Sequence, residues 1–194
     1  RAAKRAGVPV RIAHSHSTAG RGEPIRNAMK WILRRFSNVY PTHRMACSRH
    51  AGEWLFGKGA EFEVVRNAID LFQFDFDAEA RKGERAELGI RDKTFVVGHA
   101  GRFVPQKNHA FLIEMFAEIL QRNTDSLLLL VGEGPLLESV RELTRARKIA
   151  DKVRFIGHRE EMGRLYQAFD VFCLPSNYEG LGMVAIEAQV SGLP

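Results

Sequence analysis

Short apolar runs alternate with amphipathic segments along most of the chain, and the alternation is most regular in its second half. The apolar runs that we expect to form strands there cover residues 95–100, 127–131, 153–156 and 170–174. Each run is followed by apolar positions at helical spacing, which predict helices over residues 109–121, 135–147, 160–168 and 182–190. Continuous apolar strands that alternate with helices are typical of a parallel sheet covered on both faces. The pattern therefore predicts an α/β fold with a doubly wound, Rossmann-like sheet.

The first part of the chain follows the same pattern less completely. Predicted strands cover residues 9–14, 44–48 and 62–65, and predicted helices cover residues 23–38 and 53–56. The longer helix has apolar residues that we expect to be buried on the domain core: Ile25, Met29, Ile32, Leu33 and Phe36. The pattern resets after residue 74. We therefore predict two domains: residues 1–74 as the C-terminal part of one Rossmann-like domain, and residues 75–194 as a second domain, incomplete at its C-terminus.

The composition is that of a globular protein, with 45% apolar and 27% charged residues. No stretch approaches the roughly 20 apolar residues that a membrane-spanning helix needs, and residues 1–5 lack the apolar core of a signal peptide. We expect both ends to be cut from a longer protein, because the chain begins like the end of a helix and ends like a turn. Cys47 and Cys173 lie far apart, without the spacing of a disulfide framework or zinc site. They indicate a cytoplasmic setting.

The positive charge is concentrated in the first part of the chain. The net charge is +6, but residues 1–60 hold 12 Lys and Arg against two acidic residues, a net +10, which leaves −4 for the rest. In helix 23–38, four cations lie opposite the apolar face: Arg26, Lys30, Arg34 and Arg35. They form either a solvated face or a surface for an anionic membrane or substrate. A polyanion- or nucleic-acid-binding protein is an alternative, although the chain has no recognised module for it.

The loop after strand 95–100 has the composition of a phosphate site. Gly98 and Gly101 permit close approach of the backbone, and Arg102 and Lys107 follow. Asn108 is a candidate N-cap for the next helix. Two cations that converge on a helix N-terminus suit a diphosphate group, although a surface loop with two solvated cations is the alternative.

The next two loops carry weaker signals. Gly132 and Gly134 begin a dinucleotide fingerprint, but the third glycine is replaced by Leu137, so a tight turn before a helix is favoured. The sequence Gly157-His158-Arg159 suits either a site beside a nucleotide base or a plain turn.

The fourth loop combines two carboxylates with a glycine-rich helix start. Glu179 ends the loop, Gly180 and Gly182 open the helix, and Glu187 follows inside it. Free backbone N–H groups at a helix start favour anions, and carboxylates accept hydrogen bonds from sugar hydroxyls. A sugar phosphate therefore fits this loop; the alternative is one capping and one surface glutamate.

Residues 98–109 and 175–194 closely resemble the donor-binding domain of the retaining GT-B glycosyltransferases of family 4, the glycosyl transferases group 1, of the bacterial surface-polysaccharide type. The family's Gly-Arg-x4-Lys loop corresponds to Gly101, Arg102 and Lys107, and its Glu-x7-Glu motif corresponds to Glu179 and Glu187. Residues 67–70 resemble the family's Asn-Gly-hydrophobic-Asp domain junction, with alanine at position 68 instead of glycine.

The resemblance implies a role for each of these residues. Arg102 and Lys107 would hold the donor diphosphate, Glu187 the ribose hydroxyls and Glu179 the donor sugar. The residues that it places against the sugar, phosphate or base are Gly180, Leu181, Gly182, Met183 and His158. It also places a strand-end histidine of the acceptor domain opposite the donor sugar; His14 is favoured over His16 because it directly ends the apolar strand.

The resemblance implies retaining transfer from a nucleotide-diphosphate sugar, with a UDP-sugar favoured over a GDP- or ADP-sugar. The acceptor would be a saccharide or a lipid-linked saccharide, reached from the cytoplasmic face of the membrane. We expect no cofactor and no metal, because cations occupy the diphosphate position. Asp75 and Asp77 spell an Asp-x-Asp metal motif of another glycosyltransferase fold, but they lie at the predicted domain junction.

Overall fold

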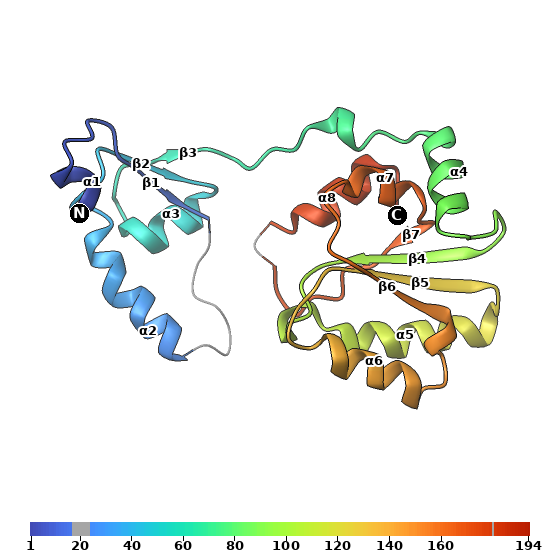
Figure 1. The fold of residues 1–194 in the computed structure, drawn as a ribbon. Helices are drawn as coiled ribbons and strands as arrows, with labels where there is room; N and C mark the ends of the chain where they lie inside the picture. The colour runs from blue at the N-terminus through green and yellow to red at the C-terminus, as the bar shows by residue number, and fades with distance from the viewer. Residues whose placement is uncertain (17–23, 180) are drawn as a thin grey trace. The chain divides into compact units, whose positions relative to one another are not determined.

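The computed structural model describes residues 1–16, 24–179 and 181–194, and it divides the chain into two compact units (Figure 1). The N-terminal unit is Arg1–Ala68 and the C-terminal unit is Ile69–Pro194. The predicted domain boundary, after residue 74, lies slightly further along the chain. The short helix η2 (Leu71–Gln73) and Phe74 belong to the C-terminal unit because the Phe74 ring lies 6.1 Å from the ring of Tyr166.

The C-terminal unit is built on a four-stranded parallel sheet with the order β6-β5-β4-β7. Its strands are β4 (Phe95–Ala100), β5 (Ser126–Val131), β6 (Val153–Gly157) and β7 (Val171–Phe172). From β4 the chain proceeds to β5 and β6 on one side and then returns to β7 on the other side. Sheets of this kind bind ligands at such a reversal, in the crevice outside the carboxyl ends of the two strands on either side of it, here β4 and β7.

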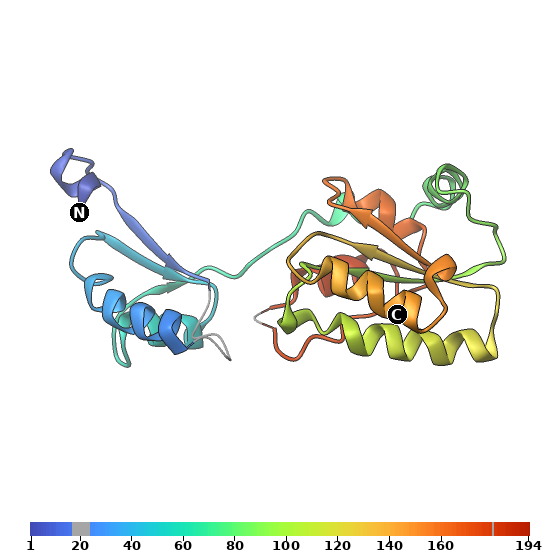
Figure 2. The same ribbon diagram turned by 60° about the horizontal axis from the view of Figure 1, so that its bottom comes forward.

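Helices cover both faces of this sheet, as the doubly wound prediction requires (Figures 1 and 2). Helices α5 (His109–Arg122) and α6 (Leu137–Ala146) lie on one face, over Val97, Leu128 and Leu130. Helices α7 (Met162–Gln167) and α8 (Met183–Val190) lie on the other face with α4 (Ala78–Glu87). The segment that links α7 to β7 adds Phe169 to the core of that face, beside Val96 and Leu129. Short helices η3 (Pro105–Lys107) and η4 (Ala150–Lys152) complete the unit.

Helix α4 has no counterpart in the sequence prediction, because its inner face is polar. Glu84 and Arg85 are its buried residues. The Arg85 guanidinium donates to the carbonyl oxygens of Ala168 at 3.0 Å and Arg91 at 2.8 Å, and it lies 3.4 Å from the Asp170 carboxylate. Helix α4 is thus held to the domain by hydrogen bonds of Arg85, and it lacks the apolar stripe from which an amphipathic helix is predicted.

The N-terminal unit contains a three-stranded parallel sheet with the order β1-β2-β3. The strands are β1 (Ile12–Ser15), β2 (His43–Ala46) and β3 (Glu63–Val64). The helices are α1 (Ala2–Arg5), α2 (Pro24–Leu33), η1 (Arg34–Phe36) and α3 (Arg49–Phe56). The helix predicted over residues 23–38 corresponds to α2 and η1, and its predicted first residue, position 23, lies outside the described residues.

The apolar face of α2 and η1 is exposed, so the prediction that it is buried is wrong. Ile25 is 80% exposed, and Met29, Ile32, Leu33 and Phe36 are each more than half exposed. Within the described residues of this unit, the buried apolar side chains are only those of Ala46, Ala51 and Phe56. This small core offers α2 too little surface to cover its apolar face. None of the helices formed by the described residues has the length and apolar character needed to cross a membrane.

Candidate functional site

Four loops meet at the carboxyl edge of the sheet in the C-terminal unit. Their described residues are 101–108, 132–136, 158–161, and 173–179 with 181–182, and each loop follows one of the four strands. Because the strands are parallel, this edge collects side chains that are distant in sequence. Of the predicted site residues that the structure describes, these loops hold Gly101, Arg102, Lys107, His158, Glu179, Leu181 and Gly182.

Backbone hydrogen bonds join three of these loops into one framework. The Phe103 N–H donates to the Glu133 carbonyl oxygen at 2.9 Å, and the Gly132 N–H donates to the Gly157 carbonyl oxygen at 2.8 Å. Gly132 has a φ of +128°, and a Cβ there would lie 2.3 Å from the carbonyl oxygen of Gly101. Glycine is therefore required for close packing of two loops, which agrees with the tight turn that the sequence favours.

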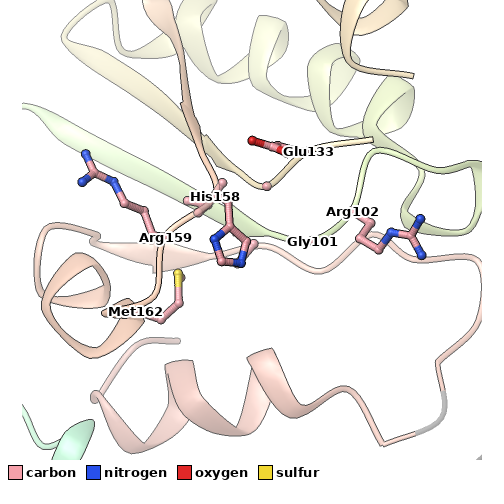
Figure 3. A pocket seen from close by; sticks show the side chains of 9 residues that line it. Gly101, Arg102, Glu133, His158, Arg159 and Met162 are labelled. Carbon is pink, nitrogen blue, oxygen red and sulfur yellow. The ribbon is translucent and has the colours of Figure 1, made fainter. Parts of the chain in front are cut away.

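A cavity of about 370 Å³ opens at the ends of β4, β5 and β6 (Figure 3). Its walls include Gly101, Glu133, His158 and Met162. The His158 side chain is exposed, and Arg102 lies at the rim with its guanidinium directed away from His158. Backbone groups, an imidazole and apolar floor atoms together suit a planar heteroaromatic ring.

Lys107 and Glu179 form an ion pair across the β4–β7 crevice. The Lys107 Nζ lies 2.6 Å from Glu179 Oε1, and both side chains are half-buried. Burial raises the pKa of the Glu179 carboxyl, but the hydrogen bond and the positive charge of Lys107 outweigh it and leave that pKa below its usual value. The Gln106 side chain donates to the carbonyl oxygen of Tyr178 at 2.9 Å, which ties the two loops together. The crevice thus holds an ionised cation–carboxylate pair.

A buried histidine that the sequence analysis did not identify lies beneath this pair. His99 Nδ1 is 2.8 Å from the carbonyl oxygen of Cys173, so Nδ1 carries the proton and donates it. A Cβ on Gly101 would lie 3.2 Å from His99 Nε2 and 3.1 Å from Lys107 Cε, so the imidazole and the lysine converge on the loop. Burial lowers the pKa of His99 to about 4. The ring is therefore neutral at pH 7 and adds no charge that would repel Lys107.

A second buried imidazole packs against the first. The His109 ring lies 4.8 Å from that of His99 and stacks on Phe103 at 4.1 Å, with distances between ring centroids. Burial, followed by the proximity of His99, lowers the pKa of His109 to about 3. Asn108 occupies the predicted N-cap position of α5 with a left-handed φ of +53°, but its side chain makes no cap hydrogen bond. Two neutral imidazole rings, those of His99 and His109, therefore pack beside the loop that follows β4.

Glu187 is positioned by a tyrosine that the sequence analysis also missed. The Tyr166 hydroxyl donates to Glu187 Oε2 at 2.9 Å, and burial together with the Glu187 charge raises the pKa of Tyr166. Tyr166 lies on α7 and Glu187 on α8, which cover the same face of the sheet. No local sequence pattern indicates that these two side chains meet. Gly182 caps α8 with a left-handed φ of +61°, and Met183 begins the helix. Leu181 is exposed, and Gly180 lies outside the described residues.

The predicted His14 and the Asp-x-Asp motif do not belong to these four loops. His14 belongs to β1 of the N-terminal unit, with its ring 4.1 Å from that of His16. Asp77 is the N-cap of α4, where its carboxylate accepts hydrogen bonds from the backbone of residues 79 and 80, and Asp75 is exposed nearby. Within residues 1–16, 24–179 and 181–194, no group of three or more His, Cys, Asp or Glu side chains could hold a metal ion.

Comparisons with known proteins identify relatives of this chain. Residues 80–194 match the family model described as "Glycosyl transferases group 1". All of the chain aligns with 52% of the protein EpsF of Bacillus subtilis (strain 168), at 38% identity. The chain is also 31% identical, over 99% of its length and 53% of the relative, to the GDP-mannose-dependent alpha-(1-6)-phosphatidylinositol monomannoside mannosyltransferase of Mycolicibacterium smegmatis.

A solved structure has the same fold at low sequence identity. The structure of Anabaena Alr3699/HepE in complex with UDP and glucose superposes with a TM-score of 0.79 and 22% identity, over 94% of this chain and 51% of that one. The chain thus spans about half the length of the curated relatives that it matches.

Proposed function

Since the chain belongs to the glycosyl transferases group 1 family and has an α/β GT-B fold, we propose that its C-terminal unit binds a nucleoside diphosphate sugar. The whole protein would transfer that sugar to a saccharide or lipid-linked acceptor. The observation that carries the proposal is the Lys107–Glu179 pair, which lies in the β4–β7 crevice. Family membership favours this enzyme over the nucleic-acid-binding alternative.

The ion pair suggests how the donor is received. An incoming diphosphate competes with Glu179 for Lys107, and Arg102 at the loop rim adds a second cation. Release of Lys107 frees the Glu179 carboxylate to accept hydrogen bonds from hydroxyls of the donor sugar. Lys107 then exchanges the Glu179 carboxylate for the diphosphate, and Glu179 exchanges Lys107 for hydroxyl donors, so neither charged group is left without a hydrogen-bond partner.

The base and ribose fit the remaining features of the edge. We assign the base to the cavity beside His158 and the ribose hydroxyls to Glu187, which Tyr166 orients. A volume of about 370 Å³ is near the lower end of ligand pockets and favours a pyrimidine over a purine. UDP in the HepE complex supports a UDP-sugar, whereas the mycobacterial relative is named for GDP-mannose. A GDP-sugar is therefore the second candidate, ahead of an ADP-sugar.

The proposed reaction retains the anomeric configuration and uses no metal. The bond from the anomeric carbon to the phosphate oxygen breaks, and its electron pair passes to the diphosphate. Arg102, Lys107 and backbone N–H groups of residues 181–183 stabilise that charge; removal of one such donor typically costs about 2.7–4 kcal/mol of barrier. The acceptor hydroxyl attacks the same face, and the departing phosphate takes its proton. His14 is assigned to the donor sugar from the acceptor side.

We further propose that the protein works at the cytoplasmic face of a membrane. The exposed apolar residues of α2 lie on the same short segment as Arg35, also exposed. Apolar side chains beside cations are typical of segments that lie in the interface of an anionic bilayer. This arrangement would bring the enzyme to a lipid-linked acceptor.

The test of the proposed function is donor hydrolysis in the absence of acceptor. The protein is incubated with UDP-glucose, UDP-galactose, GDP-mannose and ADP-glucose, and the anomer released is recorded by proton NMR. We expect a UDP-sugar to be cleaved first, with the α-anomer appearing before mutarotation and with Glu179→Gln slowing the release. Initial release of the β-anomer would contradict retention, and failure to cleave any donor would contradict the function.

A further inference from the structure

The N-terminal unit has a cavity of its own, of about 290 Å³, at the carboxyl end of β1. It is lined by His14 from β1, His16 directly after β1, Lys30 and Arg34 from α2 and η1, and Trp54 from α3. In parallel sheets this edge is where ligands bind. The cavity is therefore in the position of a second binding site, and of its lining residues only His14 is also assigned to the donor sugar.

The side chains that line this cavity are held in place by the fold. His14 lies on β1 and His16 directly follows that strand, and their ring centroids are 4.1 Å apart. Arg34 donates through Nη1 to the carbonyl oxygen of Trp54 at 3.1 Å, and its guanidinium lies 5.9 Å from the Trp54 ring centroid. The buried Ser15 hydroxyl donates to the Ala51 carbonyl oxygen at 2.8 Å and fixes β1 against α3.

The charge of the cavity has one sign. Two imidazoles, an ammonium and a guanidinium surround it, and none of the described residues lining it is acidic. This local excess agrees with the net charge of +10 over residues 1–60. The indole of Trp54 adds a flat apolar wall of the kind against which sugar rings or alkyl groups pack.

We propose that this cavity binds the phosphate or diphosphate group of a phosphorylated sugar acceptor. The inference rests on the proposed function, because it names the chemical class of the acceptor. Several N–H donors arranged around a hollow match the several oxygens and the double charge of a phosphate better than they match a neutral hydroxyl group. Arg34 supplies a planar guanidinium held by Trp54, Lys30 an ammonium group and the histidines two further ring nitrogens. Placement beside His14 puts the phosphate on the acceptor side of the reaction.

The binding test uses inorganic pyrophosphate on the full protein saturated with UDP, so that the donor site is filled. Imidazole NMR signals of His14 and His16 report binding in this cavity alone. We expect both to shift on titration, and the double substitution Lys30→Gln/Arg34→Gln to weaken the apparent affinity by at least about tenfold. Lys58→Gln removes one positive charge, half of what the double substitution removes, from an exposed position of the same unit and should change the affinity less than about twofold.

Several results would overturn the proposal. They are the absence of any shift of the two histidine signals, and an equal loss of affinity in Lys58→Gln, which would indicate unspecific charge attraction. Should the double variant be unfolded by circular dichroism, Arg34→Lys and His16→Gln provide milder replacements that must show a smaller loss in the same direction. Shifts without any donor hydrolysis would refute the proposed function while leaving the anion site in place.

Kinetic measurements distinguish the two sources of such a group. A soluble sugar 1-phosphate and a polyprenyl diphosphate sugar in phosphatidylcholine vesicles are compared with a neutral methyl glycoside as acceptors. We expect Lys30→Gln/Arg34→Gln to raise KM for whichever phosphorylated acceptor is used, without raising the donor KM. An equal rise in KM for the neutral glycoside would contradict a phosphate site.

Discussion

Acidification should destabilise the C-terminal unit through His99 and His109. Both imidazoles are buried, and burial lowers the pKa from 6.5 to about 4 for His99 and to about 3 for His109. Between these values the unfolded chain binds more protons than the folded one. The stability from the neutral rings is therefore complete above pH 6.5 and is lost as the pH falls toward the folded values.

The magnitude follows from the size of the pKa shifts. One pKa unit corresponds to about 1.4 kcal/mol, so lowering the pH from 7 to 5 should cost about 2 kcal/mol of unfolding free energy for each histidine. The substitution His109→Phe keeps a ring against Phe103 and removes one titrating group. We expect this variant to lose about 2 kcal/mol less than the wild type over the same pH interval.

The assay is urea unfolding at pH 7 and pH 5, followed by circular dichroism. Both tryptophans of the chain, Trp31 and Trp54, lie in the N-terminal unit, so their fluorescence reports that unit separately and should be unaffected by His109→Phe. Replacement of the exposed His158 by glutamine is the matched control. If wild type and His109→Phe lose the same stability between pH 7 and pH 5, the buried rings do not titrate as the structure requires.

Three further predictions concern the donor and the membrane. Glu187→Gln should weaken UDP binding measured by calorimetry and spare a 2′,3′-dideoxy analogue, because the amide accepts less well from ribose hydroxyls; unchanged UDP affinity would refute the assignment. Turnover should survive EDTA; activity lost on chelation and restored by Mg²⁺ or Mn²⁺ would favour Asp75 and Asp77 as ligands instead. The protein should sediment with anionic but not neutral liposomes and be released by salt, because each cation near the surface, Arg35 among them, contributes about 1 kcal/mol of binding free energy. Equal binding to anionic and neutral liposomes would contradict an electrostatic attachment.

The strands of the C-terminal unit could be predicted because their burial leaves a direct trace in the sequence. Residues 127–131 are wholly apolar, and the structure buries each of them inside the parallel sheet. The weaker elements show the limit of this signal. Strand β7 is paired over only Val171–Phe172, shorter than the apolar run, and α4 escaped prediction because Arg85 and Glu84 replace its apolar stripe.

The site could be predicted only as far as local motifs reach. Lys107 and Glu179 were identified separately, but their ion pair depends on β4 and β7 being neighbours, which no local pattern specifies. Tyr166 and His99 were missed for the same reason, since each acts on a residue brought to it by the sheet. The exposed face of α2 shows the reverse case, in which helical periodicity predicted burial without a surface to pack against.

The central claim is that Lys107 holds the diphosphate of the donor. Calorimetric titration of UDP and uridine into the wild type and into Lys107→Ala tests it, with Lys93→Ala as a control at the opposite edge of the sheet, just before β4. Loss of a charge-assisted hydrogen bond costs about 1.5–3 kcal/mol, so UDP should bind Lys107→Ala about 10- to 150-fold more weakly while uridine affinity changes less than about twofold. An equal loss for UDP and uridine, or the same UDP affinity in both variants, would contradict the claim.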